Sequence, residues 1–227
     1  MFAVYKKELK TYMFSPIGYI FVGLFLLILS LFFYIGIFNY QYLNFEYLFY
    51  DGTTILIFVL PLLTMRLFSE ERKNGTEQLL LTSPRSTTSI VLGKFFAAGT
   101  VVLFTELLTL MYYGILDYFG DPSLPIALST LLGFFLLSLS FISIGMFISS
   151  LSENQIISAF VTIGVFLLLL FGSNIAGVFN AFNLSRFFQE SFITGLVMVK
   201  NIILFLAIII LFILLTIIFL QKRKNLK

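Results

Sequence analysis

Long apolar runs separated by short polar links set the pattern of this chain. Each run approaches or exceeds the length that a helix needs to cross about 30 Å of hydrocarbon at about 1.5 Å per residue. A membrane-spanning strand would instead alternate apolar and polar residues, which no stretch does consistently. The pattern therefore predicts an all-α membrane protein with six transmembrane helices. Their approximate limits are 17–38, 52–68, 90–116, 125–149, 156–174 and 200–220.

The segment 1–14 predicts a helix that lies in the membrane interface, because apolar side chains fall on one helical face and lysines on the other. Ser15 and Pro16 suit the cap and first residue of the first span. A secretory signal peptide is the alternative, but the run 17–38 is too long and no small-residue cleavage site follows it. We expect the segment to remain in the mature protein. The two faces carry Phe2, Tyr5, Leu9, Tyr12 and Met13, and Lys6, Lys7 and Lys10.

Residues within the runs indicate how the helices pack. Pro61 should kink the second helix or leave a carbonyl free. Small residues in the run 125–149 favour close helix contact, whereas the thirty phenylalanines suit lipid-facing and packing positions. The small residues are Gly133, Ser138, Ser140, Ser143 and Gly145.

Composition excludes several classes of protein. The chain is 59% hydrophobic and 11% charged, whereas a soluble domain carries about 25% charged residues. Cysteine and histidine are absent, which removes disulfide scaffolds, thiol nucleophiles and the usual zinc or copper ligand sets. The net charge of +3 is too small to argue for nucleic acid. We expect no cofactor or metal in this chain.

The distribution of lysine and arginine predicts the orientation, because positively charged short loops stay in the cytoplasm. With the N-terminus inside, twelve of the fourteen basic residues are cytoplasmic and only Arg186 and Lys200 lie outside. Six spans place both termini in the cytoplasm, in a multi-pass protein of the cytoplasmic membrane. The links 39–51, 117–124 and 175–199 then lie outside. The inner links are 69–89 and 150–155, and the whole chain 1–227 reads as one domain.

The inner link 69–89 is the densest local signal. Gly75 can end a charged extension of the second span, and Thr76 can cap a short helix that Pro84 ends. Such a helix would expose three leucines beside carboxylate and amide groups, a mixture that suits docking into a groove on another protein. An ordinary solvated loop is the alternative.

The same link resembles the segment after the second span of ABC-2 type permeases, and the N-terminus is similar to the branch of gliding-motility and nitrous-oxide-reductase accessory permeases. The matching residues of the link are Glu70-Glu71, Gly75-Thr76, Leu79-Leu80, Ser83-Pro84 and Val91-Leu92-Gly93-Lys94-Phe95. Those of the N-terminus are Tyr5-Lys6-Lys7-Glu8-Leu9-Lys10 and Ser15-Pro16-Ile17-Gly18-Tyr19.

The resemblance implies an interfacial elbow helix, six spans with a type V exporter-like ABC-2 fold, and a first coupling helix around 76–82. It also implies two copies of a cytoplasmic ABC ATPase subunit and a second permease chain, identical or related. The longer, semi-apolar outer link 175–199 has the amphipathic character of re-entrant helices. The residues expected to contact the ATPase are Glu70, Glu71, Arg72, Gly75, Thr76, Glu77, Gln78, Leu79 and Leu80, with a second contact at Ser152, Glu153 and Asn154.

ATP binding is expected on the partner, because no phosphate-binding loop of the form GxxxxGK[ST] is present. The pair Gly93-Lys94 is followed by Phe95 and lacks the earlier glycine. We therefore expect ATP and Mg²⁺ on the ATPase subunit, and no catalytic residue here. An ABC permease subunit, working as an exporter, is the resulting prediction.

Glu106 is the carboxylate placed well inside a span, where a charged group costs about 2.5 to 3.5 kcal/mol on insertion scales. A structural hydrogen bond or a position nearer the headgroups is one interpretation. The other is a group that lines a transport path or the dimer interface.

Two other classes stay open. An ion-coupled secondary transporter or channel-like protein would need ion sites near the midplane and usually shows inverted repeats, which the two halves of this chain do not. A membrane-embedded hydrolase would need a Gly-x-Ser-x-Gly motif or paired intramembrane aspartates, and neither appears.

Overall fold

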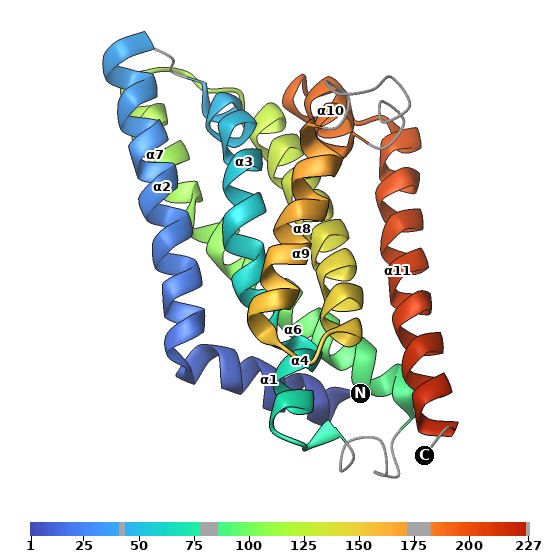
Figure 1. Ribbon diagram of the computed structural model, residues 1–227. Helices are drawn as coiled ribbons and strands as arrows, with labels where there is room; N and C mark the ends of the chain where they lie inside the picture. The colour runs from blue at the N-terminus through green and yellow to red at the C-terminus, as the bar shows by residue number, and fades with distance from the viewer. Residues whose placement is uncertain (41–43, 78–85, 172–182, 226–227) are drawn as a thin grey trace.

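The computed structural model describes residues 1–40, 44–77, 86–171 and 183–225, and helices are the only regular elements in them. Figure 1 shows a bundle flanked by α2 (Pro16–Tyr40) and α11 (Val199–Asn225), with residue 1 and the end of α11 at the same end. Five helical runs are long and apolar enough to cross a membrane. The prediction of an all-α membrane protein is confirmed.

The predicted span 156–174 corresponds to α9 (Gln155–Phe171), a shorter apolar helix of 17 residues. That length lies at the lower limit for a spanning helix. The end of the predicted span, 172–174, lies outside the described residues.

The N-terminal helix α1 (Phe2–Phe14) runs across the end of the bundle, and the chain turns sharply into α2 after it (Figure 1). Its polar face carries the three predicted lysines, which are exposed, while Tyr12 is buried. Glycines allow the two close approaches that place it. A Cβ on Gly18 would lie 2.1 Å from the Tyr12 carbonyl oxygen, and one on Gly93 would lie 3.0 Å from Val4.

The second span begins earlier than the predicted limits 52–68, and the helical run that contains it extends over Phe45–Lys73. Helix α3 (Phe45–Thr64) includes Glu46 in its first turn, where a carboxylate interacts favourably with the helix dipole. The ring of Phe45, its first residue, is fully buried. The helix is interrupted at Met65, and α4 (Arg66–Lys73) continues the chain. Pro61 lies one turn before this interruption, consistent with the expected local disturbance.

The third span is also divided. Helix α6 (Thr87–Leu108) starts after Ser86, whose hydroxyl accepts a hydrogen bond from the Ser89 N–H, and α7 (Leu110–Phe119) continues it. At Thr109 the backbone N–H and the side-chain hydroxyl both donate to the Glu106 carbonyl, at 3.0 and 2.6 Å. This tight turn replaces the regular ladder within the predicted run 90–116.

Helix α8 (Leu124–Leu151) is the centre of the bundle and packs against α3, α6, α9 and α11. Its predicted small residues allow this packing. A Cβ on Gly145 would lie 2.5 Å from Thr64 Oγ1, and one on Gly133 would lie 2.2 Å from the Phe192 ring. The expectation of close contact through these residues is confirmed at both glycines.

Two short helices, α10 (Leu184–Phe188) and η3 (Gln189–Ile193), cover the opposite end of the bundle. They come from the outer segment predicted over 175–199, of which 175–182 lies outside the described residues. The rings of Phe188 and Phe192 are fully buried, and the Ser129 hydroxyl donates to the Phe192 carbonyl at 2.8 Å. These contacts tie the segment to α8.

Candidate functional site: the basic end of the bundle

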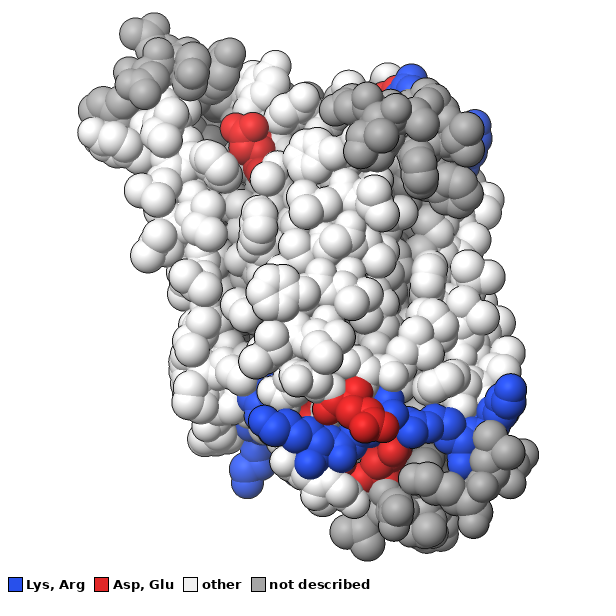
Figure 2. Space-filling model, viewed as in Figure 1, with Lys and Arg blue, Asp and Glu red and all other residues white. Residues whose placement is uncertain are grey.

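Charged side chains gather at one end of the molecule (Figure 2). This basic end consists of α1, α4 with Glu77, the start of α6, the link between α8 and α9, and the last turns of α11. Most described lysines and arginines lie here, and their carboxylate partners come from elements far apart in sequence. The basic end is therefore the candidate functional site.

The centre of the basic end is a buried lysine. Lys94 of α6 is 1% exposed, and its Nζ donates to Glu8 Oε1 of α1 at 3.2 Å and to Glu71 Oε1 of α4 at 2.9 Å. The ammonium also lies 5.3 Å from the centre of the Phe68 ring. We call Glu8, Glu71 and Lys94 the lysine cluster. Because a buried charge without a partner is strongly unfavourable, the cluster holds three helices in one arrangement.

A second group joins the other elements of the basic end. Arg72 donates from Nη1 to the Leu151 carbonyl at the end of α8, at 2.8 Å, and from Nη2 to the Glu153 carboxylate. Glu77 lies 3.8 Å from Arg72 Nε and accepts from Arg223 of α11 at 2.9 Å. We call Arg72, Glu77, Glu153 and Arg223 the arginine cluster. Glu153 is 76% exposed, so its pair contributes little stability, whereas Arg72 and Glu77 are largely buried.

Helix α4 ends at Lys73, and Gly75 turns the chain just after it, as the sequence predicts. This residue has a φ of +70°, which glycine adopts without strain. The Thr76 N–H bonds to the Glu71 carbonyl at 2.9 Å and the Gly75 N–H to the Arg72 carbonyl at 3.1 Å. These two bonds satisfy the last carbonyls of α4 in the Schellman pattern. The turn directs the chain toward Glu77, back into the arginine cluster.

The junction between α3 and α4 is stabilised by Ser149 of α8. Its Oγ accepts from the backbone N–H groups of Phe68 and Ser69, both at 3.1 Å, and donates to the Met65 carbonyl at 3.1 Å. An interruption in a helix leaves such N–H groups without partners, and the serine supplies one from the neighbouring helix. The break is thus built into the packing of α8.

One further contact stabilises the start of α4, and another fastens the junction to α1. Arg66 forms two parallel hydrogen bonds to the Glu70 carboxylate, both at 2.6 Å. The Tyr12 hydroxyl donates to the Leu63 carbonyl at 3.0 Å. Burial raises the pKa of Tyr12, and the nearby Glu8 carboxylate raises it further, so the hydroxyl keeps its proton and remains a donor.

The structure divides the predicted contact residues into two sets. Glu71, Arg72 and Glu77 are engaged in the two clusters, and Glu70 pairs with Arg66. Gly75 and Thr76 are exposed at the turn. Gln78, Leu79 and Leu80, with most of the expected coupling helix 76–82, lie outside the described residues.

The predicted second contact lies on the link between α8 and α9. The Asn154 side chain accepts from the Ile156 N–H at 2.9 Å, and the Ser152 hydroxyl bonds to the Asn154 backbone, so both residues cap the start of α9. Glu153 and Asn154 are exposed, next to Arg72. The two predicted contact segments therefore meet at one surface.

Sequence reasoning missed Glu8, Lys94, Arg223 and Ser149 as members of this site. Glu8 follows Tyr5 and precedes Tyr12 at helical spacing, which places it on the apolar face of α1. Lys94 is the one lysine in its apolar run. These two features were the available signal, since a buried cation and a carboxylate on an apolar face both need a partner.

Glu106 lies away from the basic end, inside α6 just before the turn at Thr109. It is 3% exposed, and neither carboxylate oxygen has a hydrogen-bond partner among the described residues. A hydrogen bond to another described residue therefore does not compensate the burial of the Glu106 carboxylate. Its burial inside one chain also places it away from the exposed flanks of the bundle.

The arrangement at the basic end suits mechanical connection more than chemistry. Within the described residues no group of three or more histidine, cysteine or acidic residues could hold a metal ion. The sequence matches the family described as ABC-2 family transporter protein over residues 2–225. The chain belongs to this family. It is accordingly a multi-pass membrane permease subunit of an ABC transporter, and the predicted ABC-2 permease fold is confirmed.

No curated protein sequence matches the permease. The expected branch of gliding-motility and nitrous-oxide-reductase accessory permeases therefore stays a prediction. An ABC-2 permease generally works with an ABC ATPase. The basic end is therefore the candidate surface for that contact.

Proposed function

We propose that the permease is an exporter subunit moved by two copies of a cytoplasmic ABC ATPase, which bind ATP and Mg²⁺ and contact the basic end. The observation that carries this proposal is the lysine cluster together with the arginine cluster. Through them, α1, α4, α6, the link between α8 and α9, and α11 are joined at one surface.

The orientation follows from charge. Ten described lysines and arginines lie on elements of the basic end, whereas Arg186 and Lys200 lie at the other end. Basic residues in short links are retained in the cytoplasm, so the basic end faces the cytoplasm and both termini are cytoplasmic. The ATPase would therefore reach this surface from the side on which ATP is available. The ten residues are Lys6, Lys7, Lys10, Arg66, Arg72, Lys73, Lys94, Lys222, Arg223 and Lys224.

The coupling runs from the surface into the spans. The turn at Gly75 and the exposed Glu153 form the contact, together with the segment 76–82. When the ATPase subunits close, they move α4, and the lysine cluster passes this motion to α1 and α6. Buried ion pairs suit this role because separating them would leave charges unpaired, so the three helices move together.

A second permease chain completes the transporter. The first span has only 17% of its most apolar window buried within one chain, and the last span has 28%. One of these flanks can therefore pack against a second copy while the other faces lipid. Native mass spectrometry of the transporter should show two permease chains, and a complex with a single permease chain would contradict this part of the proposal.

Deletion of residues 76–82 tests the docking surface. Tagged permease should capture the ATPase subunit, identified by its phosphate-binding loop in mass spectrometry, and the deletion should reduce the yield at least tenfold. Asp121→Asn at the opposite end is the matched control and should leave the yield unchanged. Equal capture by the deletion variant, with normal membrane insertion, would show that the ATPase docks elsewhere.

A further inference from the structure

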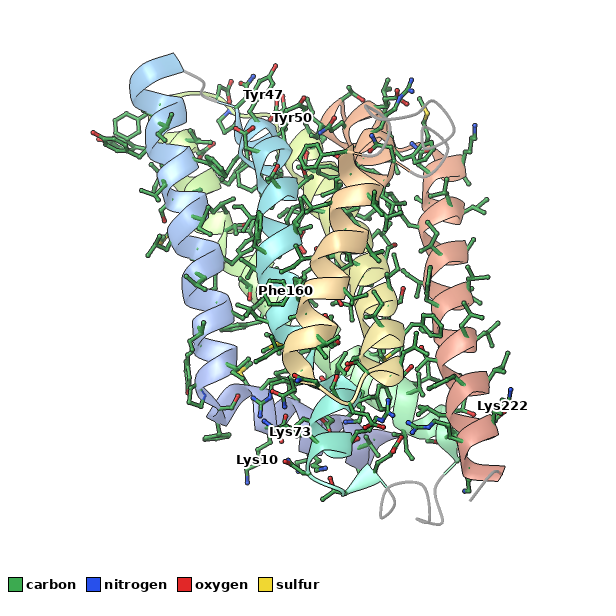
Figure 3. All side chains as sticks on the ribbon, viewed as in Figure 1. Lys10, Tyr47, Tyr50, Lys73, Phe160 and Lys222 are labelled. Carbon is green, nitrogen blue, oxygen red and sulfur yellow. The ribbon has the colours of Figure 1, made fainter. Side chains whose placement is uncertain are left out.

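A cavity of about 400 Å³ opens at the end of the bundle opposite the basic end. It lies between α2, α3 and α7, and it is lined by Phe32 and Phe33 of α2, by Leu116 of α7, and by Tyr47, Tyr50 and Asp51 of α3. Figure 3 shows the two tyrosines near the end of α3 that lies far from the basic end. The volume falls in the range typical of small-molecule sites, about 300 to 1,000 Å³.

Asp51 is the charged residue in the lining of this cavity. It is exposed, and no ion pair or hydrogen bond to its carboxylate occurs among the described residues. At about 1.5 Å per residue, Asp51 lies roughly 22 Å from Arg66 at the basic end. Its carboxylate is therefore too far from the clusters of the basic end to pair with their lysines or arginines.

The surroundings of Asp51 are acidic. Glu46 lies on the same helix, and Asp117 follows directly after the lining residue Leu116. No lysine or arginine lines the cavity. Arg186, a basic residue at this end, is paired with Glu190 at 2.6 Å. Asp51 is the one carboxylate in the lining, and a cavity with a carboxylate and no cation in its lining attracts positive ligands.

The aromatic walls of the cavity suit a lipophilic cation. The rings of Phe32, Phe33, Tyr47 and Tyr50 provide aromatic surface, and aromatic faces attract a cation within about 6 Å of the ring centre. Phe33 is held in place by the Tyr112 ring, with centroids 4.9 Å apart. A small, strongly hydrated ion would gain little from these rings, whereas a lipophilic cation can use both the rings and the carboxylate.

We propose that this cavity binds a lipophilic monovalent cation, with its charged centre beside the Asp51 carboxylate and its apolar groups among the aromatic side chains of α2 and α3. The site goes beyond the proposed function, because it concerns the other end of the permease and needs no ATPase. Its ligand class is an ammonium or phosphonium group with bulky apolar substituents.

Binding of tetraphenylphosphonium to the permease in phosphatidylcholine nanodiscs tests the site. Tetraphenylborate has similar size and shape but negative charge, so it is the matched probe. We expect saturable binding of the phosphonium, no saturable binding of the borate in a separate titration, and at least a tenfold higher phosphonium Kd for Asp51→Asn. Asp51→Glu should retain binding within about threefold, which separates loss of charge from misfolding.

Two variants complete the test. Phe32→Leu removes one ring from the cavity wall and should weaken phosphonium binding severalfold. Asp121→Asn removes a carboxylate that does not line the cavity and should leave the Kd unchanged. Absence of saturable phosphonium binding, equal binding by Asp51→Asn, or equally tight saturable binding of tetraphenylborate in its own titration would each overturn the proposal. None of these outcomes bears on ATPase docking, which is measured separately at the basic end.

Discussion

Two sets of carboxylates in the permease meet opposite conditions. At the basic end Glu8, Glu71 and Glu77 each lie within reach of a lysine or arginine from another helix. Toward the other end Glu106 and Asp51 have no charged partner among the described residues. The first set fixes helices to one another, while the second leaves charge for water, a ligand or a proton to satisfy.

This difference assigns different tasks to the two regions. Paired charges at the basic end make α1, α4 and α6 one mechanical unit, as a surface moved by an ATPase requires. Carboxylates without partners are tolerated only where something else stabilises them, so they mark places where the state of the permease can change. Substitutions at each end should therefore have different effects on stability and on coupling.

The largest loss of stability is expected for Lys94→Met. Removing the ammonium leaves the buried carboxylates of Glu8 and Glu71 facing each other, so the unfolding free energy should fall by about 3 to 5 kcal/mol. Thermal unfolding in detergent measures it. Lys73→Met, at an exposed side chain with no ion pair among the described residues, is the control and should change stability by less than about 0.5 kcal/mol.

The triple variant Lys94→Met, Glu8→Gln and Glu71→Gln sharpens this result. It removes the unpaired charges together with the lysine, so most of the lost stability should return. If Lys94→Met is as stable as the wild type, the lysine cluster does not hold the three helices.

A change in the packing of α8 against α3, next to the basic end, is expected to give the next largest loss of stability. Gly145→Ala places a Cβ 2.5 Å from Thr64 Oγ1, so it should separate α8 from α3 and cost roughly 1 to 3 kcal/mol. Gly164→Ala on α9 meets no atom within 4 Å and should be neutral or stabilising. Equal melting temperatures for the two variants would show that α8 and α3 need no close contact.

Ser149→Ala is expected to cost about 1 to 2 kcal/mol, because the N–H groups of Phe68 and Ser69 lose their acceptor. Hydrogen exchange of these two amides should rise in the variant. Thr11→Ala removes an exposed hydroxyl on α1 and serves as the control. Unchanged exchange at both amides would mean that the junction does not depend on Ser149.

The smallest effect on stability is expected for Glu106→Gln, which keeps the shape of the side chain and removes a buried group that can be charged. Stability should stay within about 1 kcal/mol of the wild type or rise. ATP hydrolysis coupled to the permease should fall, because the neutral amide cannot replace a carboxylate that changes state. Unchanged coupled hydrolysis would assign Glu106 no role in the cycle.

Much of the fold follows from the sequence because hydrocarbon leaves few alternatives. Apolar length predicts the helices, and the small residues Gly133 and Gly145 indicate where α8 packs closely. Gly75 indicates the end of α4, since a positive φ is most easily adopted by glycine. These features depend on local sequence alone.

Features that depend on tertiary contacts could not be read from the sequence. The polar residues Glu46 and Asp51 suggested an outer link, yet Phe45 and Phe49 bury their rings and extend α3 through it. The pairing of Lys94 with Glu8 joins residues far apart in the chain. The cavity at Asp51 required the relative positions of α2, α3 and α7.

The most direct test of the account measures whether the ATPase moves the third span. The chain has no cysteine, so spin labels can be attached at Tyr118→Cys on α7 and Val199→Cys on α11, both exposed at the end opposite the basic end. In the complex with the ATPase, trapped ATP should shift the distance between the labels by several ångströms, on the order of the 5.4 Å pitch of one helical turn. The triple variant of the lysine cluster should lose this shift. A fixed distance in a complex that hydrolyses ATP, or the full shift in the triple variant, would contradict the account.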